Sequence, residues 1–315
     1  MVMEELLRQL EAIRLAFELT KPSPIVEENI RRESLLKSAL YSAKIEGNQL
    51  SYEEVINGLN DKTRAKLEVF NLLKAHKFIY SDKAAKKLSL NFIKKLHQLA
   101  MDRLLAAPGK FRAEAGAIFN QAGIAVYFSP PPTEIIPRLT SLLKQTAASI
   151  EPVPVKAMKL HFSFEKIHPF IDGNGRVGRL LTALVMNLGG FGFKGLVSIE
   201  EMVNQQKGEY YQALAETKNS RPLTEFLLKL YLDQGKKILT RLHQPEIANQ
   251  PNLPLRRREI LQIIKDHPYA SFDFLRRRFL SVNPKTLHYD LKKLQEQKLI
   301  IKVGFTRGAV YEAKL

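Results

Sequence analysis

His168-Pro-Phe-Ile-Asp-Gly-Asn-Gly-Arg-Val-Gly-Arg179 is the stretch of this 315-residue sequence that says most about its fold. Apolar residues recur at helical spacing before it, over 155–167, and after it, over 176–188, so the stretch connects two predicted helices. Its glycines let a ligand come close to the backbone, and the N–H groups that open the second helix have no partner within that helix. The sequence therefore predicts an anion-binding nest at the start of the second helix.

Two cationic side chains at the same place favour a ligand with several negative charges. Arg176 and Arg179 are three residues apart, on one face of the first helical turn, where positive charge opposes the helix dipole. A bound polyphosphate would remove this conflict. The string Gly173-Asn-Gly-Arg-Val-Gly178 also matches the GxGxxG dinucleotide pattern, but that fingerprint needs a preceding strand, and no strand pattern comes before it.

The same twelve residues match the Fic-domain signature HxFx[D/E]GNGRxxR at every specified position, and the sequence resembles this family from about Ser42 to Tyr231. A short hairpin pattern over 117–128 lies where Fic proteins carry a flap that positions their target. The resemblance implies a mainly α fold, with a Fic helical core and a β-hairpin flap. It also implies transfer of AMP from ATP to a Ser, Thr or Tyr hydroxyl of a protein target, or of the enzyme itself, with release of pyrophosphate.

The resemblance assigns a role to each residue of the motif. His168 would be the catalytic general base, since an imidazole can accept a proton near neutral pH. Asp172 would hold Mg²⁺, which prefers carboxylate and phosphate oxygens. The nucleotide contacts would be Gly173, Asn174 and Gly175 at the α-phosphate, Arg176 and Arg179 at the β- and γ-phosphates, and Tyr210 and Tyr211 beside the adenine. For the two tyrosines, ordinary helix packing is an equal alternative.

A second match to the family precedes the core. Ser42-Ala-Lys-Ile-Glu46-Gly47 resembles the inhibitory motif [S/T]xxxE[G/N], and Gly47 suits the end of a helix. Glu46 then lies at a helix C-terminus, where the dipole disfavours a carboxylate and a cation would compensate. The resemblance names Arg179 as that cation and implies an ion pair in the place of the γ-phosphate. It places the chain in the class with an N-terminal inhibitory helix, in which ATP is held unproductively.

The sequence changes in character near residue 244. Residues 244–254 include three prolines and few large apolar side chains, which is typical of a linker. Three helical patterns and two short strands follow, in the order of a winged helix-turn-helix. We therefore expect an N-terminal helical region with the inhibitory helix at 1–85, a Fic core at 86–243, this linker, and a small α+β winged-helix domain at 255–315.

Positive charge is concentrated in this last domain. Residues 251–315 carry fourteen Lys+Arg against six Asp+Glu, in a chain whose formal net charge is +17. Such a surplus favours partners rich in phosphate. A recognition helix would present Lys285, Tyr289 and Lys292 to DNA, with Arg307 in the wing reaching phosphate. Docking of a protein and an ordinary solvated basic face remain alternatives.

The composition also excludes several classes of site. There are no cysteines, so disulfides, thiolate zinc sites and cysteine nucleophiles are excluded. No apolar run is long enough for a transmembrane helix, and the N-terminus lacks the order of a signal peptide. We expect a cytoplasmic protein without a membrane partner; an oligomer is compatible with the sequence.

Two other functions fit the same residues. The pocket could remove AMP, with Glu46 assisting the attack of water, or it could transfer another phosphate-containing group. Alternatively, the chain could be a DNA-binding regulator whose Fic domain senses a nucleotide. The target protein and the signal that relieves inhibition are not encoded in any motif.

Overall fold

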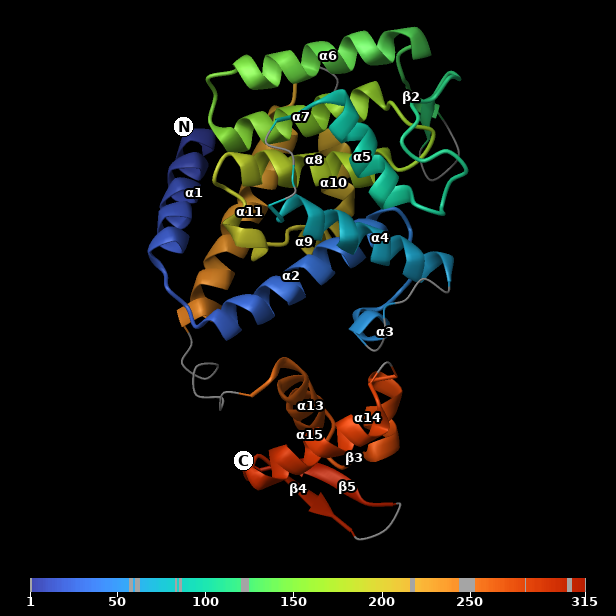
Figure 1. Ribbon diagram of the computed structural model, residues 1–315. Helices are drawn as coiled ribbons and strands as arrows, with labels where there is room; N and C mark the ends of the chain where they lie inside the picture. Colours follow the sequence, from blue (N-terminus) through green and yellow to red (C-terminus); the bar gives the residue numbers. More distant parts are fainter. Residues whose placement is uncertain are drawn as a thin grey trace. The chain divides into compact units, whose positions relative to one another are not determined.

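The computed structural model describes residues 2–56, 59, 63–82, 84, 87–119, 125–215, 219–243, 253–280, 282–304 and 308–314. The protein is mainly α, with two small antiparallel sheets among these residues (Figure 1). Its contacts divide it into two compact units. The first contains residues up to Tyr52 and from Leu59 through the last long helix; the second contains α3 from Glu53 on and the described residues from Leu253 on. Every described helix is too short or too polar to cross a lipid bilayer.

The first unit is a layered assembly of helices with one hairpin at its edge (Figure 1). Its elements are α1 (Val2–Leu19), α2 (Pro24–Ile45), α4 (Arg64–Ile79), α5 (Leu90–Met101), β1 (Ala117–Phe119), β2 (Ala125–Phe128), α6 (Pro132–Ala148), α7 (Val153–Ile167), α8 (Asn174–Leu188), the 3-10 turn η1 (Phe193–Gly195), α9 (Glu200–Gln205), α10 (Lys207–Ala215) and α11 (Arg221–His243).

Helix α8 forms the centre of this unit. It packs against α7, α5, α4 and α2, and every residue from Arg176 to Met186 is buried. The run Leu180-Leu-Thr-Ala-Leu-Val-Met186 is apolar on nearly all sides, as expected of a helix enclosed by others. The N-terminus of α8, which carries the end of the glycine motif, is therefore held by the core.

Two helix boundaries differ from what apolar spacing predicts. The spacing predicts a helix from residue 28 to 45, yet α2 begins at Pro24, because proline at the first helical position lacks only an N–H that would have no partner. The spacing also predicts one helix over 199–217, whereas α9 and α10 are separate. Gln206 lies between them with φ −109° and ψ 36°, outside the helical region.

The second unit combines helices with a small sheet. Its elements are α3 (Tyr52–Ile56, from Glu53 on), α13 (Leu255–Asp266), β3 (Ala270–Ser271), α14 (Phe272–Arg278), α15 (Pro284–Glu296), β4 (Ile300–Val303) and β5 (Val310–Ala313). The strands are antiparallel in the order β3-β5-β4. Arg307 and residues 120–124 of the expected flap lie outside the described residues.

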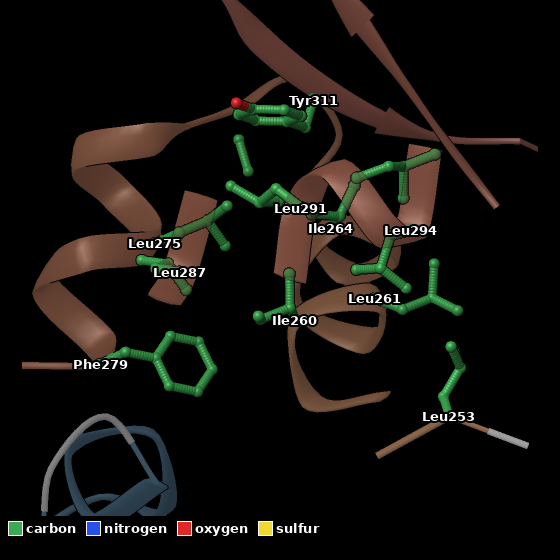
Figure 2. Close-up of a cluster of buried hydrophobic side chains, with 12 residues drawn as sticks. Leu253, Ile260, Leu261, Ile264, Leu275, Phe279, Leu287, Leu291, Leu294 and Tyr311 are labelled. Atoms are coloured by element: carbon green, nitrogen blue, oxygen red, sulfur yellow. The ribbon is translucent and has the colours of Figure 1, made fainter. Parts of the chain in front are cut away.

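One apolar cluster holds this unit together (Figure 2). Helix α15 contributes Leu287, Leu291 and Leu294, which recur at helical spacing and are all buried. The side chain of Asn283 caps this helix by accepting a hydrogen bond from the Lys285 N–H (2.9 Å). Because the leucines take one face of α15 into the core, Lys285, His288, Tyr289 and Lys292 remain exposed on the other side of the helix, while Asp290 is buried.

Candidate active site

The turn between α7 and α8 is shaped by two left-handed residues. His168 ends α7 with φ 47° and ψ 60°, and Gly173 precedes α8 with φ 82° and ψ 9°. Asn174 closes the turn, because its Oδ1 accepts from the Phe170 N–H (2.9 Å) and its Nδ2 donates to the Phe170 carbonyl (2.8 Å). The Asn174 side chain is thereby committed to the turn, and only its backbone can reach a ligand.

The buried side chain of His97 packs against this turn. His97 stacks on the ring of Phe170, with ring centroids 3.8 Å apart and 12° between the planes. Its Nδ1 accepts from the Gly109 N–H (2.6 Å), so its Nε2 carries the proton and donates to the Asp172 carbonyl (3.0 Å). Burial lowers the pKa of His97, which keeps the ring neutral. The turn is therefore fixed at both Phe170 and Asp172.

His168 is placed as a neutral imidazole. Burial lowers its pKa, and the backbone carbonyl of Glu165 opposes this shift only in part. Arg112 anchors the backbone here: its Nε donates to the His168 carbonyl (2.8 Å) and its own N–H donates to the Pro169 carbonyl (2.9 Å). A neutral imidazole at pH 7 can accept a proton, as a general base must.

Arg179 is held by the C-terminal end of α2. Its Nε donates to the Ser42 hydroxyl (2.9 Å), and its second terminal nitrogen donates to the Ser42 carbonyl (2.9 Å) and to Glu46 Oε1 (2.8 Å). Burial alone would lower the pKa of Arg179, but the Glu46 carboxylate raises it above its ordinary value. The pair joins two elements that are 133 residues apart in sequence.

The Glu46 carboxylate also lies against the start of α8. A Cβ atom added to Gly175 would collide with Glu46 Oε1. Only about 10 Å³ of space lies on the inner side of Arg179, among His161, Tyr210 and Glu200, which is at most enough for one water. A larger ligand must therefore approach Arg179 from the side that Glu46 occupies.

Arg176 has a different set of partners. It pairs with Glu68 of α4 through one terminal nitrogen and with Asp172 Oδ1 (2.7 Å) through the other. Glu68 in turn accepts a hydrogen bond at Oε2 from the Asn48 side chain (2.8 Å). A continuous polar chain thus runs from Asn48, just beyond the inhibitory motif, through Glu68 and Arg176 to Asp172.

The two tyrosines have different surroundings. Tyr210 is buried, and its hydroxyl lies 2.8 Å from His161 Nε2. The Thr182 hydroxyl donates to the Gly178 carbonyl (2.9 Å), so its oxygen accepts from His161 Nδ1 (3.1 Å), and Nε2 accepts from Tyr210. Burial lowers the pKa of His161 to about 4. Tyr211 remains 43% exposed.

Glu165 is a buried carboxyl group near the same helix. Its Oε1 has no hydrogen-bond partner among the described residues, and a Cβ atom added to Gly178 would collide with it. Burial raises the pKa of Glu165 to about 8, although the charge of Arg179 acts in the opposite direction. Glu165 is therefore protonated at neutral pH.

Asp172 offers a fitting donor for a hard cation. Its side chain is 47% exposed, and its Oδ1 accepts from the Gly173 N–H (2.5 Å) and from Arg176. The described residues contain no group of three or more His, Asp or Glu side chains that could hold a metal ion. Mg²⁺ is commonly held in this way, with one carboxylate, water and phosphate oxygens of the substrate.

Several residues of the site carried no signal in the sequence. The spacing of His97 and His161 suggested no ligand set, and Glu68, Arg112 and Glu165 were parts of ordinary helical or loop patterns. Their roles depend on partners that are distant in sequence, such as Glu68 and Arg176, 108 residues apart. The only signal that could have indicated these residues is a polar side chain at a position that helical spacing assigns to a buried face.

Comparisons with known proteins relate part of this chain to one family. Residues 87–186 match the Fic/DOC family. A protein adenylyltransferase Fic from Drosophila willistoni is 25% identical over 242 residues, which make up 71% of this chain and 45% of that protein. A probable protein adenylyltransferase from Aquifex aeolicus is 41% identical over 61 residues, 19% of each chain. The chain spans less than half the length of these curated relatives.

Solved structures resemble the fold. A Fic family protein from Desulfovibrio desulfuricans G20 superposes with a TM-score of 0.68 at 20% identity, over 99% of this chain and 96% of that one. A Fic-1 segment from C. elegans gives a TM-score of 0.61 at 20% identity, over 79% of this chain and 74% of that one. At these identities the similarity concerns the fold alone.

Proposed function

We propose that this chain, which contains a Fic domain in residues 87–186, is an autoinhibited protein adenylyltransferase. It transfers AMP from ATP to a Ser, Thr or Tyr hydroxyl of a target protein or of itself. One observation supports this most: the Glu46 carboxylate pairs with Arg179 and lies against Gly175, where the N-terminus of α8 favours an anion. A carboxylate of the chain itself thus fills a site suited to phosphate.

The triphosphate binds along the start of α8. Backbone N–H groups from Gly173 to Gly175 accommodate the α-phosphate, and the guanidinium groups of Arg176 and Arg179 bind the β- and γ-phosphates. Asp172 would hold Mg²⁺, which would supply positive charge against the phosphate oxygens. The exposed ring of Tyr211 borders the adenine, while the buried Tyr210 supports it through His161.

His168 acts on the target hydroxyl. Its neutral imidazole takes the hydroxyl proton as the hydroxyl oxygen forms a bond to the α-phosphorus. The bond from the α-phosphorus to the bridging oxygen breaks, and pyrophosphate leaves with the electron pair. AMP remains on the target oxygen, and the imidazolium then returns its proton to solvent. The N–H groups at the start of α8 stabilise the charge that develops on the α-phosphate.

The hairpin β1–β2 supplies a docking edge for the target. The two strands pair antiparallel, with Ala117 opposite Phe128, and Tyr127 joins them to the last turn of α7 by donating its hydroxyl proton to the Lys166 carbonyl (3.1 Å). An extended target segment can add to such an edge through backbone hydrogen bonds, which depend little on sequence. This explains how one site could accept different hydroxyl side chains.

Glu46 acts as the brake in this proposal. While it remains on Arg179, the γ-phosphate has no cation and the nucleotide cannot take the transferring position. The inhibitory segment belongs to an N-terminal helical region at 1–85, followed by the Fic core at 86–243, a linker at 244–254 and a winged helix-turn-helix domain at 255–315. Chain order and the three-stranded sheet of the second unit support the last assignment.

The experiment compares four full-length proteins: wild type, Glu46→Gly, His168→Ala, and the double variant. Each is incubated with Mg²⁺ and ATP labelled at the α-phosphate, and intact mass is measured in parallel. We expect label on Glu46→Gly, little on wild type, and none on either protein that lacks His168. The mass gain should equal that of AMP less water.

Other outcomes separate the alternatives. Label from γ-phosphate in place of α-phosphate would replace AMP transfer by phosphate transfer in the same pocket. Loss of AMP from a pre-modified protein with wild type, but not with Glu46→Gly, would assign the chain to AMP removal. Equal labelling of wild type and Glu46→Gly would contradict the brake and leave the transfer reaction standing.

A further inference from the structure

The second unit exposes one face of α15 that the proposed reaction does not use. Lys285, His288, Tyr289 and Lys292 are exposed at helical spacing, opposite the buried leucines of the same helix. We call these four residues the α15 face. Tyr289 is 53% exposed, so this face includes an accessible aromatic ring and phenol hydroxyl. The face is therefore both accessible and chemically distinctive.

The acidic residues of α15 are paired with basic side chains and do not belong to the α15 face. Asp290, the acidic residue in the middle of α15, is 1% exposed, and two arginines of α13 neutralise it. Arg256 Nε donates to its Oδ2 (2.5 Å) and Arg257 Nε to its Oδ1 (2.8 Å). The acidic group at the end of the helix, Glu296, pairs with Lys293 (2.7 Å). The α15 face itself thus presents only basic, imidazole and phenol groups.

Cations also surround the aromatic side chain. The Arg257 guanidinium lies 5.3 Å from the centre of the Tyr289 ring, and the Lys293 ammonium lies 5.7 Å from it. His288 is held by stacking on Phe272, with ring centroids 3.7 Å apart and 4° between the planes. These contacts fix two side chains that can donate hydrogen bonds outward.

We propose that the α15 face binds the major groove of duplex DNA. The eight residues from Lys285 to Lys292 span about 10 Å along the helix, which fits a major groove about 12 Å wide. The lysines would contact phosphates and set the position, while His288 and Tyr289 would reach base edges. A protein partner fits less well, because lysine is depleted in protein interfaces and here supplies half of the face.

The test measures binding of the full-length protein to a fluorescently labelled duplex by anisotropy, without ATP, at several salt concentrations. The double variant Lys285→Glu/Lys292→Glu should bind at least about tenfold more weakly near 0.1 M salt, because two phosphate contacts become repulsive. The slope of log affinity against log salt concentration should fall by about two. Tyr289→Ala should change the preference among duplex sequences and leave this slope unchanged.

A matched control carries the same change in net charge elsewhere. Lys229→Glu/Lys237→Glu alters two exposed lysines of α11 in the first unit and should change affinity by less than about twofold. Circular dichroism and a melting curve establish that each variant is folded. The milder Lys285→Gln/Lys292→Gln serves if charge reversal unfolds the second unit.

Three results would overturn the proposal. The first is the absence of duplex binding at low salt. The second is an equal loss in the α11 control, which would make the binding an effect of net charge. The third is stronger binding of the α15 face to anionic vesicles or to an acidic peptide than to duplex, with the same dependence on Lys285 and Lys292. None of these results bears on AMP transfer, which is measured separately.

Discussion

The two arginines of the glycine motif are three residues apart, yet their acidic partners differ in kind. Glu46, the partner of Arg179, ends α2, is 30% exposed, and lies against Gly175 at the start of α8. Glu68, the partner of Arg176, comes from the middle of α4 and is 14% exposed. The first carboxylate occupies the space that the proposed function assigns to a phosphate, whereas the second contacts Arg176.

The difference indicates opposite roles for two similar ion pairs. In the proposed mechanism, Glu46 must leave before Arg179 can bind a phosphate, so its pair would oppose catalysis. Glu68 is held by Asn48 and binds a different terminal nitrogen of Arg176 from the one that faces Asp172, so we expect it to remain in place while a nucleotide binds. We therefore expect removal of the two carboxylates to change AMP transfer in opposite directions.

The largest effect should come from removing the charge of Glu46 while keeping its shape. Glu46→Gln should raise the rate of self-modification with labelled ATP by about 10- to 100-fold, because a hydrogen bond between charged groups is worth about 1.5–3 kcal/mol. Glu46→Gly should raise the rate further, since it also clears the space at Gly175. A rate for Glu46→Gln equal to that of wild type would show that shape, and not charge, holds the site closed.

The opposite effect is expected at Glu68. In a Glu46→Gly background, Glu68→Gln should lower the rate by about tenfold, because Arg176 loses the partner that aims it at Asp172 and the phosphates. The loss should be larger at limiting Mg²⁺ than at saturating Mg²⁺, and direct titration of nucleotide binding should show weaker affinity. Asp102→Asn, an exposed carboxylate on the first unit, is the matched control. A faster Glu68→Gln variant would make Glu68 a second brake.

How much of this site can be predicted from the sequence depends on how far apart in the chain the interacting residues are. The turn at 168–179 could be read directly, because the glycine and asparagine that shape it are neighbours in the chain. The mainly α fold is confirmed by the solved structures, and residues 87–186 match the Fic/DOC family. The break at Gln206 was missed because apolar spacing continues through it.

Longer contacts could not be derived from spacing. Arg176 and Glu68 meet only because α4 packs on α8, and His97 reaches Asp172 only because α5 packs there as well. The resemblance implied the partner of Arg179, and that contact is present at 2.8 Å. No feature of the sequence implied the partner of Arg176, since a glutamate at a helix position is most often a solvated one.

A third carboxyl group, that of Glu165, differs from those of Glu46 and Glu68. It is buried, and its Oε1 has no hydrogen-bond partner among the described residues. Its pKa is raised from 4.5 to about 8, so between pH 7 and 8 the folded protein holds a proton that the unfolded chain has released. Stability must therefore fall as the pH rises through this window, by about 1–2 kcal/mol, and level off above it.

Glu165→Gln should remove this fall, as measured by denaturant unfolding at each pH. Histidines do not obscure the effect, because burial lowers the pKa of His161 to about 4 and that of His168 below its ordinary value. The contribution of these two histidines to the free energy of unfolding rises with pH and has reached nearly its full value by about pH 7, where the range of interest begins. An unchanged slope in Glu165→Gln would mean that Glu165 is ionised in the folded protein.

The smallest effect should come from Ser42, which assists Glu46 without carrying charge. Its hydroxyl accepts one hydrogen bond from Arg179, but its carbonyl accepts a second that substitution leaves intact. Ser42→Ala should therefore weaken the contact between the end of α2 and Arg179 by about 0.5–1 kcal/mol. It should raise the rate of self-modification by about two- to fivefold, well below the effect of Glu46→Gln. The test compares Ser42→Ala with the double variant Ser42→Ala/Glu46→Gly. If Ser42 acts only by assisting Glu46, Ser42→Ala should not raise the rate further in the Glu46→Gly background. An additional gain in the double variant would instead mean that Ser42 restrains Arg179 independently of the carboxylate.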